Sequence, residues 1–146
     1  MKIYNKSAPK KFALLNKYQA GISLLGSEVK AIRQGHLDLS SSYVKIMGKE
    51  AFLINAKIFP YKYSRVENYQ EDRTRKLLLH KKEILAIKSR LETGNYTLVP
   101  VSIYTKNNNF KLEVGLAKGK KKHEVRKDAK RHAIERAQER EMKELL

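Results

Sequence analysis

The chain has 146 residues, of which 32 are Lys or Arg and 15 are Asp or Glu, so its formal net charge at pH 7 is +17. This length is typical of one domain with its own core, and so basic a chain predicts a polyanionic partner, RNA above all. The absence of cysteine excludes disulfides and thiolate metal sites. No apolar run reaches the roughly 18 to 20 residues that span a bilayer, and the first residues lack a hydrophobic signal segment. We therefore expect a cytoplasmic, metal-free protein.

The first predicted elements are an extended segment and a short helix. Residues 12–25 are rich in apolar side chains and contain Gly21, a pattern typical of a strand with a break. Residues 26–33 place Val29, Ile32 and Arg33 at helical spacing, and we expect Ser27 to be the N-cap. Gly35 is then expected to end this helix.

A hairpin and a polar loop follow. Residues 43–47 and 51–59 predict two strands joined by a turn at Gly48 and Lys49. Pro60 should end the second strand, and residues 61–72 read as a loop.

The second half predicts one helix and a second hairpin. Residues 79–91 carry Leu and Ile on one side of a helix, and Gly94 stops it. Residues 96–105 and 110–116 predict paired strands joined by residues 106–109, and apolar side chains alternate cleanly in the second strand. Because strands outnumber helices and no βαβ rhythm is present, we expect a mainly β fold, a small antiparallel barrel or sheet with peripheral helices.

Residues 118–146 form a basic C-terminal tail. It holds eleven Lys or Arg and six Asp or Glu, a net charge of +5, and very few large apolar residues. Such a segment cannot bury enough apolar surface to fold alone, so we expect it to be disordered when free and to form a helix from about Glu124 on a partner. The chain thus divides into a body, residues 1–117, and a tail, residues 118–146. The alternative for the tail is a merely solubilising charged segment.

A basic cluster surrounds an apolar triplet at residues 73–82. We expect Arg73, Arg75 and Lys76 to face phosphates while the leucines 77–79 pack against the core. The alternative is that the leucines only anchor the segment in the core and the basic residues are solvated without binding RNA. Lys30 and Arg33, at i and i+3 of the short helix, add two cations on one side. Three tyrosines of the polar loop, Tyr61, Tyr63 and Tyr69, are candidates for stacking on bases.

The sequence offers little support for an enzyme. The histidines 36, 80, 123 and 132 match no metal site or triad, no Gly-rich phosphate loop is present, and the acidic residues are spread evenly. Glu28 alone is no sign of catalysis and is expected to be solvated or paired with a neighbouring Lys. We expect neither catalysis nor a cofactor.

Three strings resemble the SsrA-binding proteins, the family also called small protein B. They lie at residues 26–30, 72–81 and 115–121, in the order and spacing of that family, and the similarity extends over nearly the whole chain. The resemblance implies an OB-like antiparallel β-barrel and a tail that is helical when bound. It also implies an adaptor that binds the tRNA-like domain of transfer-messenger RNA (tmRNA).

The resemblance further implies the partners. Proteins of this family deliver tmRNA, together with elongation factor Tu, to bacterial ribosomes stalled on mRNA without a stop codon. Their body replaces the missing anticodon arm at the decoding centre of the small subunit, and their tail probes the empty mRNA channel. For this chain we accordingly expect tmRNA and the ribosome as direct partners, elongation factor Tu as an indirect one, no membrane, and a monomer.

Carried over by position, the resemblance implies further RNA-binding residues. On the body they are Lys10, Gln19, Leu78 and His80, and in the tail they are Lys118, Lys120, Lys121, Arg126, Lys130 and Arg131, with Glu124 and Asp128 beside the RNA or holding the helix. Gln19 replaces a Glu that the family usually has, Lys10 replaces the His that faces the decoding centre, and Val125 replaces a Lys.

Two other classes remain open. A structural ribosomal protein has the same composition, and stoichiometric co-sedimentation with salt-washed subunits would favour it. An RNA-processing enzyme would instead require turnover that disappears when one acidic residue is replaced.

Overall fold

The computed structural model describes residues 1–64 and 67–119 and, in the C-terminal segment, residues 130, 131, 133, 134, 136–138 and 140. The elements in chain order are β1 (Lys2–Tyr4), α1 (Ala8–Lys11), β2 (Phe12–Ile22), α2 (Gly26–Arg33), β3 (Leu37–Asp38), β4 (Tyr43–Met47), β5 (Glu50–Ile54), β6 (Lys57–Ile58), β7 (Arg75–Leu78), α3 (Lys81–Thr93), β8 (Tyr96–Lys106) and β9 (Asn109–Gly119).

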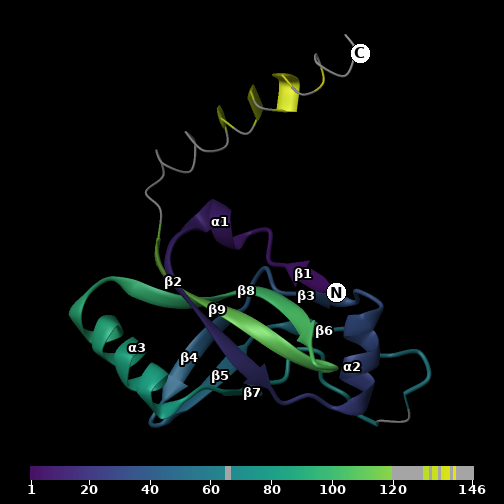
Figure 1. Ribbon diagram of the computed structural model, residues 1–146. Helices are drawn as coiled ribbons and strands as arrows, with labels where there is room; N and C mark the ends of the chain where they lie inside the picture. Colours follow the sequence, from purple (N-terminus) through teal and green to yellow (C-terminus); the bar gives the residue numbers. More distant parts are fainter. Residues whose placement is uncertain (65–66, 120–129, 132, 135, 139, 141–146) are drawn as a thin grey trace.

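The main sheet closes on itself. Its strand order is β1-β8-β4-β5-β7-β2-β9, every pairing is antiparallel, and β9 also pairs with β8. Strands β8, β4, β5, β7, β2 and β9 therefore form a ring, while β1 extends the sheet beside β8 (Figure 1). Closure removes exposed strand edges. The predicted fold class, mainly β with an OB-like antiparallel barrel and peripheral helices, is confirmed.

Both predicted hairpins have two-residue turns. Between β8 and β9 the turn residues are Asn107 and Asn108, with φ of 52° and 64°. A type I′ turn needs positive φ at both central positions, and Asn tolerates that backbone better than most residues. Between β4 and β5, Gly48 takes the positive φ of 64°.

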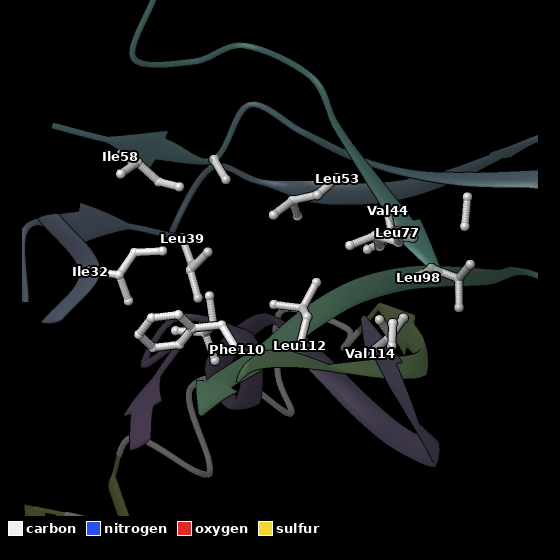
Figure 2. Packing of buried hydrophobic residues seen from close by; sticks show 14 of the residues in the cluster. Ile32, Leu39, Val44, Leu53, Ile58, Leu77, Leu98, Phe110, Leu112 and Val114 are labelled. Carbon is white, nitrogen blue, oxygen red and sulfur yellow. The ribbon is translucent and has the colours of Figure 1, made fainter. Parts of the chain in front are cut away.

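The core fills the inside of the barrel (Figure 2). The clean alternation predicted for the last strand is confirmed, since Phe110, Leu112, Val114 and Leu116 of β9 are all buried. Leu53 of β5, Leu77 of β7 and Leu98 of β8 are buried in the same cluster. The core-facing side chains of one strand thus pack against those of the others.

Helices α2 and α3 lie at opposite ends of the barrel (Figure 1). Ala31 and Ile32 of α2, and Ile84 and Ile87 of α3, are buried. Within the described residues, no helix combines the length and the apolar character needed to cross a membrane.

Three local predictions are corrected. The N-cap of α2 is Leu25 rather than Ser27, and the Glu28 carboxylate accepts the Leu25 N–H at 2.8 Å. The predicted strand 51–59 is two strands, because Asn55 between β5 and β6 has a φ of 62°. Helix α3 begins at Lys81, so Leu79 packs on the core from the segment before it.

Strand β9 continues beyond residue 117, where the body was expected to end. Lys118 and Gly119 pair with Ala13 and Phe12 of β2. The described residues between 130 and 140 have helical backbone. The predicted start of the tail helix at Glu124 lies outside the described residues, and disorder of the free tail stays a prediction.

Candidate nucleic-acid interface

An exposed leucine and a lysine lie on either side of strand β2. Gly21 of β2 pairs with Leu78 of β7 on one side and with Lys111 of β9 on the other. A Cβ at Gly21 would lie only 3.2 Å from the Leu78 Cβ, so the glycine leaves room for Leu78 against β2. The Leu78 side chain is 62% exposed.

Leu78 and Lys111 line one shallow hollow, which we call the Leu78–Lys111 hollow. Its lining is completed by Gly21, Ile22, Leu24, Val29, Asn108, Asn109 and Phe110. An exposed apolar side chain beside a cation can contact a sugar or base while the ammonium group binds phosphate. This surface is the best candidate for RNA contact on the barrel wall.

Gln19 lies on the outer surface of β2, where its side-chain amide donates to the Tyr104 hydroxyl. Its neighbour in register is Glu113 of β9, which accepts from Ser102 Oγ at 3.0 Å. Glu113 is also 3.4 Å from Lys17 Nζ and 3.5 Å from Lys2 Nζ.

Burial opposes the charge of Glu113, but hydrogen bonds from Ser102 and Lys17 and the positive charge of Lys17 and Lys2 outweigh it and hold the pKa of that carboxyl below its ordinary value. One carboxylate thus faces two lysines, so this outer surface remains basic.

Arg75 is the main correction to the predicted site. Its side chain has no exposed surface, so the prediction that it faces phosphates is wrong. Arg75 Nε and Nη2 donate to Glu28 Oε2 at 2.8 and 2.5 Å, and Nη1 donates to the Ala56 carbonyl at 2.6 Å. Arg73, 29% exposed, donates to both carboxylate oxygens of Glu28. These arginines join α2 to the barrel wall.

Glu28 is neither solvated nor paired with a lysine, contrary to expectation. Burial alone would raise the pKa of its carboxyl. Hydrogen bonds from Arg73, from the Leu25 N–H and from Arg75 outweigh burial and lower that pKa below its ordinary value. Glu28 therefore stays ionised as the centre of a buried polar network.

Tyr69 is part of the same network, and its side chain is half-buried. Its hydroxyl lies 3.0 Å from Glu28 Oε2 and 2.8 Å from the Ile58 carbonyl oxygen. Burial and the Glu28 carboxylate raise the pKa of Tyr69 to about 12. Tyr63 is the most exposed of the three candidate tyrosines.

The other predicted residues of the body are dispersed over its surface. Lys76 is half exposed and 3.1 Å from Glu50, and His80 is the exposed N-cap of α3. Lys10 of α1 lines a groove with Tyr4, Lys6 and Asp38. Lys30 and Arg33 are exposed on α2. Lys118 lies over the Tyr96 ring, 4.8 Å from its centroid.

The predicted tail residues divide into two groups. Lys130 and Arg131 have helical backbone and exposed side chains. Lys120, Lys121, Glu124, Arg126 and Asp128 lie outside the described residues. Among the described residues, no three His, Cys, Asp or Glu side chains gather as they would around a metal ion.

Lys111 is a candidate that the sequence analysis missed. The alternation of β9 places it opposite the buried Phe110 and Leu112, which indicates an outward side chain. Its position beside Leu78 follows only from the pairing of both residues with Gly21.

Comparison with known families decides the relationship. The family model for SmpB protein matches residues 2–144 of this chain. The chain belongs to the SmpB family. The SsrA-binding protein of Aquifex aeolicus is 44% identical over 140 residues, which are 95% of this chain and 89% of that protein. The SsrA-binding protein of Mesoplasma florum is also 44% identical over 140 residues, covering 95% and 94% of the two chains.

A solved structure agrees with this assignment. A chain in the structure described as "tmRNA-SmpB: a journey to the center of the bacterial ribosome" is 38% identical. It superposes with a TM-score of 0.69 over 83% of this SmpB family member and 85% of that chain. The predicted family is confirmed.

Proposed function

We propose that this chain is an RNA-binding adaptor of ribosome rescue. It binds the tRNA-like domain of tmRNA and brings it to bacterial ribosomes stalled on mRNA without a stop codon. The observation that carries the proposal is the correspondence with the SmpB family from residue 2 to residue 144, which includes the tail as well as the barrel. As an adaptor it binds RNA without turning over a substrate, and it works in the cytoplasm.

The barrel surface supports the RNA-binding role. The Leu78–Lys111 hollow combines an apolar contact with a cation, and Gln19 lies two residues before Gly21 on the same strand. Lys2 and Lys17 neutralise Glu113 beside it. We assign tmRNA to this surface, with Gln19, Leu78 and Lys111 as contact residues.

The tail has a separate task in this proposal. It enters the empty mRNA channel of the small subunit and forms a helix against rRNA, while the body occupies the place of an anticodon arm at the decoding centre. The working boundary lies after Gly119, because β9 pairs with β2 up to that residue. Elongation factor Tu is then a partner through tmRNA, and the protein acts as a monomer.

Sequencing of co-purified RNA tests the proposal. The full chain is purified from its own cells, and the bound RNA is compared with total RNA. Strong enrichment of one RNA with a tRNA-like domain and a short message is expected. Enrichment of bulk rRNA alone would instead identify a structural ribosomal protein.

A further inference from the structure

Two tyrosine rings that the proposed tmRNA surface does not use meet beside α2. The ring centroids of Tyr61 and Tyr63 are 5.5 Å apart, and the ring planes are inclined by 68°. This edge-to-face contact holds Tyr63 although its side chain is 71% exposed. An aromatic ring so exposed in a basic protein offers a large free apolar surface.

Two lysines accompany these rings. Lys30 Nζ of α2 lies 5.4 Å from the centroid of Tyr61, and Lys62 Nζ lies 5.6 Å from that of Tyr63. Stacking rings next to cations are the combination with which proteins bind single-stranded nucleic acid: the ring takes a base and the cation takes a phosphate.

The segment that carries the rings is anchored at both ends. On one side the Phe59 N–H donates to the His36 carbonyl at 3.0 Å. On the other side Tyr69 and Arg73 bind Glu28 of α2. Within the segment the Ser64 N–H donates to the Tyr61 carbonyl at 2.9 Å and closes a turn. These hydrogen bonds fix described residues before and after the two rings.

Helix α2 connects this surface with the hollow on the barrel wall. Val29 lines the Leu78–Lys111 hollow, and Lys30, one residue further, reaches Tyr61. Arg33 lines a second hollow with Met1, Thr105, Asn107 and Asn108, and Asn108 also lines the first hollow. Helix α2 therefore contributes two exposed cations, Lys30 beside the tyrosine rings and Arg33 beside the second hollow.

We propose that Tyr63, together with Tyr61, Lys30 and Lys62, binds an unpaired nucleotide by stacking on its base and neutralising its phosphate. This site goes beyond the adaptor function and is separate from the Leu78–Lys111 hollow. The nucleotide belongs to a single-stranded part of tmRNA or to an exposed base of the small-subunit rRNA.

The test compares Tyr63→Ala and Tyr63→Phe with the wild-type full chain. Tyr43→Ala is the matched control, because Tyr43 is another exposed tyrosine, 41% exposed on β4. Binding is measured to a transcript of the tRNA-like domain of tmRNA and to salt-washed small subunits. Tyr63→Ala is expected to weaken binding to one of these RNAs by roughly 5- to 150-fold, the loss of one stacked base. Tyr63→Phe and Tyr43→Ala should keep wild-type affinity, and the RNA that responds identifies the source.

Two results would overturn the site. Tyr63→Ala could bind both RNAs as tightly as the wild type, or Tyr63→Phe could bind as weakly as Tyr63→Ala, which would exclude stacking. Unfolding curves in urea verify that the variants are folded. Wild-type protein that fails to bind the tmRNA transcript contradicts the adaptor function instead, so the two failures are distinguishable.

Discussion

The carboxylate of Glu28 and the guanidinium of Arg75, 47 residues apart in the chain, form an ion pair with no exposed surface on either side chain. The pair joins α2 to β7. Arg75 also donates to the carbonyls of Ala56, Glu71 and Arg73, so its fork of donors is satisfied by protein. One of the three cations in the predicted RNA-binding run is thus used inside the protein.

Replacing Glu28 by Gln should destabilise the fold strongly. The variant leaves Arg75 buried without a counter-charge, which typically costs about 3–5 kcal/mol of the free energy of unfolding. Glu50→Gln is the control, because it removes the partner of the exposed Lys76 and should cost about 0–1 kcal/mol. Urea unfolding measures both. Similar losses of unfolding free energy in the two variants would mean that the buried ion pair stabilises the fold no more than the exposed one.

Lowering the pH should reduce the difference in the free energy of unfolding between the wild type and Glu28→Gln. The pKa of Glu28 is lowered in the folded chain, so its stabilising contribution is present above the unfolded pKa of about 4.3 and is lost as pH falls through the folded value. The pKa values of Glu113 and Asp38 are also lowered. Both carboxylates are present in the wild type and in the variant, so acid destabilises the two proteins equally through them. Unfolding curves between pH 7 and pH 2 should therefore converge at the acid end; a constant gap would show that Glu28 is not ionised at neutral pH.

Replacing Lys111 by Ala should weaken binding to tmRNA and reduce its salt dependence. If Lys111 neutralises one phosphate, the slope of log affinity against log salt should fall by about 0.7–0.9. Lys49→Ala removes the same charge from the β4–β5 turn and should leave the slope unchanged. Titrations at several salt concentrations measure the slopes. Equal slopes for the wild type and Lys111→Ala would show that Lys111 does not neutralise a phosphate of tmRNA.

Deleting residues 120–146 should separate RNA binding from rescue. The cut spares β9, which pairs with Phe12 through Gly119, so the barrel should stay folded. The truncated chain is expected to keep most of its affinity for tmRNA but to lose peptide tagging on stalled ribosomes. Tagging by the truncated chain would refute a channel-sensing role for the tail.

Much of the fold could be predicted because its signals are local. The alternation in β9, the helical spacing in α2 and the Gly48 turn each depend on neighbouring residues. The Ser27 cap was wrong because the helix begins earlier: the Val29 N–H already donates to the Leu25 carbonyl at 3.1 Å, which makes Leu25 the N-cap. Glu28, at the third position of the helix, accepts from the Leu25 N–H, so a residue inside the helix satisfies the backbone of the N-cap.

The candidate site was predicted less completely. Leu78 and Lys111 line one hollow because both pair with Gly21 from opposite sides, which depends on the register of three strands. Arg75 and Lys76 are adjacent in the chain but lie on opposite faces of β7, so one is buried and the other half exposed. Because the buried position of β7 is taken by a charged residue, Arg75, residue type and spacing alone could not show which face of this strand points into the core.

The sequence by itself determined the charge, the family and the strand-rich class, because composition, motif strings and periodicity are properties of the chain alone. Only the tertiary structure decided which basic and aromatic residues are available to RNA. Exposure of Arg75, Tyr69 or Tyr63 depends on partners far away in the chain: Arg75 is buried on Glu28 and Tyr69 is half-buried against it, whereas Tyr63 is exposed beside α2.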